Sequence, residues 1–133
     1  MQTHRDLDVW KEGVRLTVAG YKITKAYPRE EQFGLISQMR RAVVSVVSNI
    51  AEGAARNSKE DFIRFLYMSR GSASELETQT VVSRELAYLE QNEVDDLLSR
   101  IDSRAPLKTA LIVIARSPFD YAQGKLCDEA ISL

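Results

Sequence analysis

The sequence predicts an all-α protein, an antiparallel up-and-down four-helix bundle with a short irregular C-terminal tail. Apolar residues recur at steps of three and four in four successive segments, the spacing of a buried helical face. Short breaks separate these segments, so consecutive helices are expected to pack antiparallel. Three prolines and six glycines in 133 residues are too few for a turn-rich β-sandwich. We expect one bundle domain over 1–116 and a poorly structured tail over 117–133.

The first two helices follow from their apolar spacing. The first is expected to begin near Asp6 and to end before Pro28, because proline disfavours helical backbone in the residue that precedes it. Its predicted buried face is Leu7, Trp10, Val14, Thr17 and Tyr21. The second is expected over 31–54, although its four valines lower helix propensity. Its predicted buried face is Ile36, Met39, Val43, Val46, Ile50 and Ala54.

The third helix is predicted over 58–91, with Ser58 and Asp61 as a capping box and a bend near Gly71 as an option. Small residues lie in the middle of its buried stripe, which allows close approach of a neighbouring helix; the stripe is Phe62, Leu66, Ser69, Ala73, Leu76, Thr80, Ser83 and Ala87. A fourth helix begins near Val94 and is interrupted at Pro106. Residues 107–115 would resume it.

The composition excludes most catalytic chemistry. The single cysteine, Cys127, excludes an internal disulfide and a multi-cysteine zinc site. The single histidine, His4, excludes two-histidine metal motifs, including the paired Glu-x-x-His motifs of di-iron bundles, and leaves most nucleophilic triads without a base. We therefore expect no catalytic residue, no metal and no cofactor. The protein is predicted not to be an enzyme.

The charge distribution and the hydropathy limit the classes of partner that the protein can bind. The net charge is −1, but residues 1–57 carry 9 basic and 6 acidic side chains while residues 58–133 carry 9 and 13. A polyanion contact is therefore expected to be local and to lie in the first half. The longest uncharged apolar run, 109–115, is far shorter than a membrane span, and no signal-peptide pattern is visible. We expect a cytoplasmic protein with no membrane contact.

A polar stripe runs along the second predicted helix, opposite its apolar face: Gln38, Arg41, Ser45, Asn49, Glu52 and Arg56. Exposed helix positions usually favour lysine and glutamate, whereas Ser45 and Asn49 are poor helix formers. The stripe is either an ordinary solvated face or a surface that contacts a partner helix, a sister subunit or a ligand. Its interface candidates are Gln38, Ser45, Asn49 and Glu52.

The candidate phosphate-binding residues are basic side chains of the first half of the chain: Lys22, Lys25, Arg40, Arg41 and Arg56. Arg40 and Arg41 are adjacent, so they point to different sides of a helix and cannot form a single clamp. The loop after Pro28 would have to bring Lys22 and Lys25 beside them to form one patch. Ordinary surface charge is the alternative interpretation. There is no Gly-rich phosphate loop and no RNA-binding aromatic motif.

Several separated motifs resemble a known family. The segment 38–53, QMRRAVVSVVSNIAEG, is similar to the signature of four-helix bundle proteins encoded in 23S rRNA intervening sequences. DVWK at 8–11, FIRFL at 62–66 and RGSASELE at 70–77 resemble the companion segments in the same order. The similarity covers roughly 6–102. Pro106 and residues 117–133 depart from the family pattern.

The resemblance implies a homo-oligomeric ring, commonly a pentamer, with kinship to the accessory variability protein of diversity-generating retroelements, which binds nucleic acid and a reverse transcriptase. It implies no enzymatic activity. Two functions follow: a non-catalytic oligomer that associates with RNA or DNA, or a helical scaffold that binds a protein partner and no nucleic acid. The basic first half and the polar stripe favour the first, and the net charge of −1 favours the second.

Overall fold

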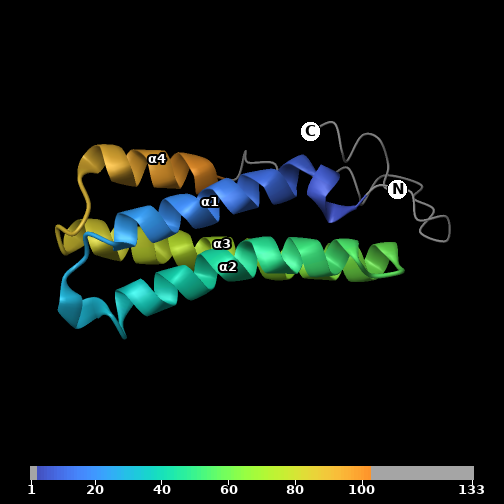
Figure 1. Cartoon of the computed structure of the whole chain (residues 1–133), viewed down its shortest axis with the longest axis horizontal. Coiled ribbons are helices and arrows are strands. Elements are labelled where there is room, and N and C mark those ends of the chain that lie inside the picture. The colour runs from blue at the N-terminus through green and yellow to red at the C-terminus, as the bar shows by residue number, and fades with distance from the viewer. Residues whose placement is uncertain (1–2, 103–133) are drawn as a thin grey trace.

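The computed structural model describes residues 3–102, which form four antiparallel α-helices (Figure 1). Their bounds are α1 (Asp8–Thr24), α2 (Leu35–Ala54), α3 (Lys59–Glu85) and α4 (Gln91–Ile101), with short 3-10 helices η1 (His4–Asp6) and η2 (Arg29–Glu31). The predicted all-α bundle is confirmed. No helix within 3–102 is long and apolar enough to cross a bilayer. The expectations for Pro106, 107–115 and the 117–133 tail lie outside the described residues.

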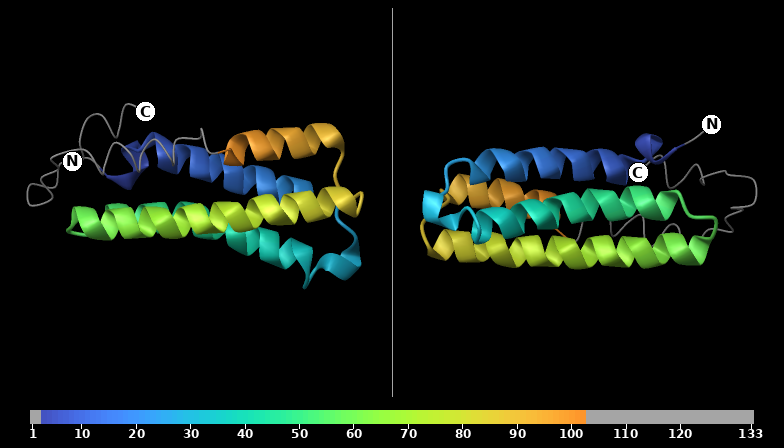
Figure 2. Two further views of the ribbon diagram at one scale, coloured as in Figure 1. Left: turned by 180° about the vertical axis from the view of Figure 1, so that it is seen from behind. Right: turned by 60° about the horizontal axis from the view of Figure 1, so that its bottom comes forward.

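The helices pack in cyclic order, α1 on α2, α2 on α3, α3 on α4 and α4 on α1. Figure 2 shows α2 and α3 running side by side, with the shorter α4 beside one end of the bundle. The core between them contains the large, fully buried side chains Leu7, Met39, Val43, Ile50, Phe62, Leu66, Leu76, Val94 and Leu97. The predicted core positions Met39, Val43, Val46 and Ile50 of α2 are confirmed, whereas Ile36 and Ala54 are half-buried.

The predicted buried face of the first helix is confirmed only in part. Leu7 is buried just before α1 and Trp10 packs half-buried against the core, whereas Val14 and Tyr21 are exposed. α1 itself buries Val9, Gly13, Leu16, Gly20 and Thr24. The physical reason is the two glycines, because a Cβ at Gly13 would lie 3.2 Å from Val47 and one at Gly20 would lie 2.9 Å from Val43. The missing side chains let this side of α1 approach α2 closely, and Val14 and Tyr21 lie away from it.

The third helix ends earlier than predicted, at Glu85, and runs unbroken past Gly71. Ala87 has a left-handed backbone (φ 60°), the Tyr88 amide donates to the Ser83 carbonyl (2.9 Å), and the Ala87 amide donates to the Arg84 carbonyl (2.9 Å). This is a Schellman motif, in which glycine usually occupies the left-handed position. Ala87, predicted to be on the buried stripe, is exposed.

The small centre of α3 does allow close approach, as predicted. The Ser69 hydroxyl donates to the Val46 carbonyl of α2 over 2.7 Å. Ser72 donates to the Ser45 hydroxyl over 2.8 Å. The Ser58 side chain accepts from the Asp61 amide (3.1 Å), which confirms the predicted N-cap of α3.

Candidate functional site

A shallow groove runs between the second half of α1, the turn that follows it, and the first half of α2. Its walls are Tyr21, Gln32, Phe33, Ile36, Ser37, Arg40, Arg41, Val44, Ser45 and Ser48. We call this surface the α1–α2 groove. It contains two of the predicted basic residues, and aromatic side chains that the sequence had not singled out. Among the described residues, no group of three or more His, Cys, Asp or Glu side chains is placed to hold a metal ion.

Arg40 connects the two helices of the groove. Its Nε donates to the Thr24 hydroxyl (3.0 Å), its Nη2 lies 3.5 Å from the Tyr21 carbonyl, and its guanidinium lies 4.7 Å from the centre of the Tyr21 ring. These carbonyl and hydroxyl groups lie in the last turn of α1, where the helix dipole favours a positive charge. Arg40 is therefore held in place by α1, and its positively charged guanidinium lies over one face of the Tyr21 ring.

Arg41 occupies the outer side of α2 and is exposed. Although the two arginines point to different sides of the helix, as predicted, both line the α1–α2 groove. Lys25 is exposed at the end of α1, and Lys22 lines a second shallow groove between α1 and α4, beside Arg100 and Asp96. The turn after Pro28 thus brings the end of α1 beside the start of α2, which the proposed basic patch requires.

The turn that carries Phe33 is fastened to the bundle by tyrosines. Tyr27 is buried, its hydroxyl lies 3.4 Å from Met39 Sδ, and its ring packs against Tyr88 with centroids 5.4 Å apart. The Tyr88 hydroxyl donates to Glu31 Oε1 (3.3 Å), while Glu31 Oε2 accepts from the Leu35 amide (3.0 Å) and so caps the start of α2.

Both of these phenols stay protonated at neutral pH. Burial raises the pKa of Tyr27 above its usual value. Desolvation and the Glu31 carboxylate raise the pKa of Tyr88 in the same direction. Each hydroxyl therefore remains available as a donor. Tyr27 holds the turn at its start, and the bonds of Glu31 to Tyr88 and Leu35 hold it at its end, so Phe33 lies in a fixed segment.

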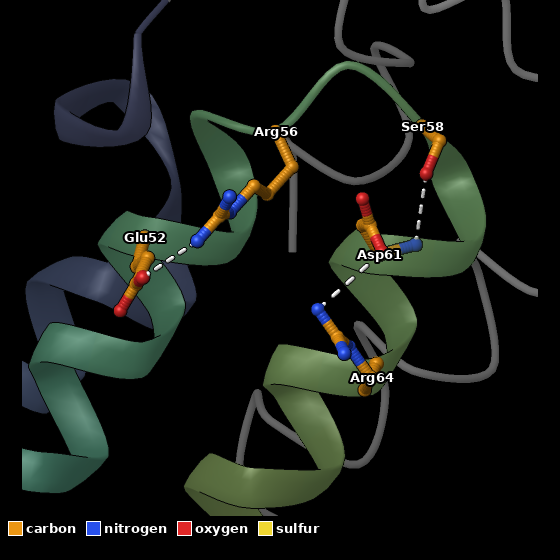
Figure 3. A network of polar contacts seen from close by, with 5 residues as sticks. All are labelled: Glu52, Arg56, Ser58, Asp61 and Arg64. Carbon is orange, nitrogen blue, oxygen red and sulfur yellow. Dashed lines mark hydrogen bonds and ion pairs between the residues drawn. The ribbon is translucent and has the colours of Figure 1, made fainter.

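Arg56 lies at the other end of α2, about 20 Å from Arg41 by the rise of an α-helix. It pairs with Glu52 over 2.8 Å (Figure 3). Its guanidinium lies 5.0 Å from the centre of the Phe65 ring on α3. The same view shows Asp61 bonded to Arg64 over 3.5 Å. The structure therefore brings Arg40 and Arg41 together with the end of α1 and leaves Arg56 outside this cluster.

The polar stripe of α2 is only partly opposite the core. Gln38 and Glu52 are exposed, whereas Ser45 and Asn49 are half-buried. Asn49 donates to the Ser45 carbonyl (2.8 Å) and hydroxyl (3.0 Å), and Ser45 accepts from Ser72 of α3. The middle of the stripe thus belongs to the contact between α2 and α3. Intramolecular bonds account for the choice of serine and asparagine there.

The sequence motifs at 8–11, 38–53, 62–66 and 70–77 lie in this order on the first three helices of the four-helix bundle. A family model described as "23S rRNA-intervening sequence protein" matches residues 5–108. The chain belongs to this family. No curated protein matches the chain. In this member of the 23S rRNA-intervening sequence protein family, the segment QMRRAVVSVVSNIAEG forms most of α2 and supplies both arginines of the groove.

Sequence reasoning missed Phe33. Its side chain is 90% exposed, the largest value among the exposed large hydrophobic residues of the described chain, followed by Tyr67 at 56%. Phe33 falls within the second predicted helix (31–54) but is not among the residues of its predicted apolar face. The predicted start of that helix is wrong, because α2 begins at Leu35 and Phe33 lies in the turn before it. Helical periodicity gives no information about a residue in a turn.

Proposed function

We propose that this member of the 23S rRNA-intervening sequence protein family is a non-catalytic homo-oligomer that associates with nucleic acid through the basic surface around the α1–α2 groove. A local group of unpaired charges carries the proposal. Within residues 3–102, no carboxylate lies within ion-pair distance of Lys25, Arg40 or Arg41, nor of Lys22 in the neighbouring α1–α4 groove. Arg15, Arg56, Arg64, Arg84 and Arg100 each pair with a nearby carboxylate, whereas the other unpaired cations of this range, Arg5, Lys11, Arg29 and Arg70, do not line the α1–α2 groove.

The difference between paired and unpaired cations matters because phosphate binding gains free energy by releasing counterions from the polyanion. An arginine that already neutralises a carboxylate contributes less to that exchange. Glu30 and Glu31 are the acidic residues of the neighbouring turn, and Glu31 is engaged by the Leu35 amide and Tyr88. These hydrogen bonds leave the charge of Glu31 in place, but the segment 22–41 carries five basic side chains against these two carboxylates, a local excess of positive charge on a chain whose net charge is −1.

Exposed apolar side chains support self-association. Val14 and Val18 form a stripe on the outer side of α1, and Tyr67, Met68 and Val82 lie exposed on α3. The contacts place α1 and α3 across the bundle from each other, so these apolar surfaces lie on different sides. A contact between two different surfaces of successive copies is heterologous and closes into a ring when the rotation allows. The pentamer implied by the family resemblance is one such ring.

Light scattering coupled to size exclusion tests the oligomer. We expect a mass several times that of the 15.0 kDa chain. Val18→Glu places a charge on the apolar stripe of α1 and should lower the measured mass, whereas Ser99→Glu, at an exposed position of α4 outside the apolar residues of α1 and α3, is the matched control. A monomeric intact protein at micromolar concentration would remove the oligomer from the proposal.

Fluorescence anisotropy with labelled RNA and DNA at two salt concentrations tests nucleic-acid association. The double variant Lys25→Ala/Arg41→Ala should weaken binding and flatten its salt dependence, because phosphate contacts contribute about −0.7 per contact to the log–log slope on single strands and about −0.9 on duplex DNA. Arg64→Ala/Arg84→Ala removes the same charge from ion-paired positions and should change binding less. No binding by the intact protein at low salt would refute this part.

A helical scaffold that binds a protein partner is the second candidate function. The observation that favours it is the exposed apolar stripe of α1, since apolar patches on a surface are typical of protein contacts. This function predicts no affinity for RNA or DNA at low salt. It also predicts that Val18→Glu abolishes the contact while Lys25→Ala/Arg41→Ala leaves it intact.

A further inference from the structure

Phe33 is exposed although the backbone around it is held by hydrogen bonds. The backbone around it is fixed by hydrogen bonds: the Gln32 amide donates to the Arg29 carbonyl (3.1 Å), and the Gly34 amide donates to the Glu31 carbonyl (3.0 Å). Glu31 and Tyr88 tie the same turn to α2 and to the loop before α4. An aromatic side chain of this size normally buries most of its surface. A firmly held turn thus presents an aromatic ring to solvent.

The surroundings of Phe33 indicate which ligand would cover the ring. Arg40, Arg41 and Tyr21 line the same groove, and the Tyr21 ring is stacked with the Arg40 guanidinium. Between them the groove offers polar groups that are able to form hydrogen bonds, namely Gln32, Ser37 and Ser48. Aromatic rings beside unpaired cations in one groove are the combination by which proteins bind single-stranded nucleic acid: bases stack on the rings and phosphates meet the cations.

We propose that the α1–α2 groove binds single-stranded RNA or DNA, with one base stacked on Phe33 and an adjoining phosphate held by Arg41, both of which line the groove. This inference rests on the proposed nucleic-acid association and names the form of the ligand. Duplex bases are already stacked on their neighbours, so a duplex offers its phosphates to the cations but no free base face to Phe33. The structure therefore predicts a preference for unpaired strands.

Four ligands of equal length distinguish the sources of this chemistry: labelled oligouridylate, labelled oligothymidylate, a blunt RNA duplex and a blunt DNA duplex. Each is titrated with the intact protein by anisotropy. We expect tighter binding of the single strands than of the duplexes. Phe33→Ala should weaken single-strand binding by about 5- to 150-fold, the equivalent of one base–aromatic stack. Its salt slope should stay unchanged, because phenylalanine carries no charge.

Leu86→Ala is the control for Phe33→Ala. Leu86 is a 49% exposed apolar residue directly after α3, outside the groove and outside the apolar residues assigned to self-association. We expect this variant to bind all four ligands as the intact protein does. Phe33→Trp retains a stacking surface and adds a fluorophore at the site. Single strands should bind it undiminished and quench its added emission.

Each contrary outcome identifies what has failed. Equal affinity for duplex and single strand, with no loss on Phe33→Ala, would overturn the stacking inference while leaving phosphate association in place. Absence of binding to all four ligands at low salt would remove the proposed nucleic-acid function itself. A Phe33→Ala variant with a lower mass by light scattering and unchanged nucleic-acid binding would place Phe33 in a protein contact, which also overturns the inference.

Discussion

The arginines at the two ends of α2 differ in whether they pair with a carboxylate. At its start, Arg40 and Arg41 line a groove with exposed aromatic rings and have no carboxylate partner in the described chain. At its end, Arg56 pairs with Glu52 and covers Phe65 of α3. Charge counted along the sequence treats these arginines alike. The comparison shows that the two ends of α2 differ in whether their arginines are ion-paired, which a count of charges along the sequence does not reveal.

Packing differs between the two ends in the same sense. Near the end of α2, Gly53 lies against the α3 backbone, and a Cβ there would be 2.6 Å from the Phe65 Cβ. At the start, a turn held by Glu31 and Tyr88 separates α1 from α2. We call the Gly53 end of α2 the closed end, because its packing against α3 stabilises the bundle. We call the start of α2 the open end, because the turn before it exposes Phe33 to solvent. Three substitutions test this division, from the largest expected effect to the smallest.

Phe62→Ala should have the largest effect on stability. Phe62 is fully buried beneath the closed end of α2, so truncation leaves a cavity and costs about 3–5 kcal/mol of unfolding free energy. Urea denaturation followed by circular dichroism measures this loss. Binding of RNA per folded molecule should not change, since the groove is at the other end. A loss below about 1 kcal/mol would contradict the description of this end as tightly packed.

Gly53→Ala should cost about 1–3 kcal/mol, because its methyl group collides with Phe65 and lies 3.3 Å from the Phe62 carbonyl. Gly71→Ala is the matched control within a helix. A Cβ at Gly71 meets nothing within 4 Å, so alanine there should stabilise α3 by about 0.5–1 kcal/mol through helix propensity. Opposite signs in thermal denaturation support the comparison, and a shared sign would refute it.

Glu31→Ala should have the smallest effect on stability, about 1 kcal/mol, through loss of the cap on the Leu35 amide. Single-strand binding should be weakened by more than this loss of stability alone would cause, because the turn that positions Phe33 loses its hydrogen bond to Tyr88. Glu30→Ala removes the same charge from the adjacent exposed position and serves as the control. Equal single-strand affinities of the two variants would show that a fixed turn is unnecessary for binding.

The sequence predicted the bundle and the core of α2 because large apolar residues there keep strict helical spacing. It was wrong in part on α1, where Gly13 and Gly20 lie on the buried side with Val9 and Leu16, while Val14 and Tyr21 are exposed. Spacing of apolar residues cannot reveal a helix that packs through its backbone. It also placed the end of α3 too late, because Ala87 adopts the left-handed backbone that glycine usually signals.

The candidate site was predicted in part. Arg40 and Arg41 were identified from composition, and the turn after Pro28 does bring the end of α1 to them. Arg56 was included because charge along one helix says nothing about pairing, and the structure places it in an ion pair at the opposite end. Phe33 was not identified because the sequence predicts it within the second helix, whereas the structure places it in the turn before α2. Its exposure depends on the fold of η2 and on the contact between Tyr88 and Glu31.

The salt dependence of single-strand binding by Arg41→Ala and Arg56→Ala tests the central claim most directly. Each variant removes one arginine, Arg41 from α2 and Arg56 from the turn directly after it, so the change in chain charge is matched. If unpaired cations at the start of α2 bind phosphate, Arg41→Ala should flatten the log–log salt slope by about 0.7 and Arg56→Ala should leave it unchanged. A flattened slope for Arg56→Ala, with no change for Arg41→Ala, would contradict the assignment of the site to the α1–α2 groove.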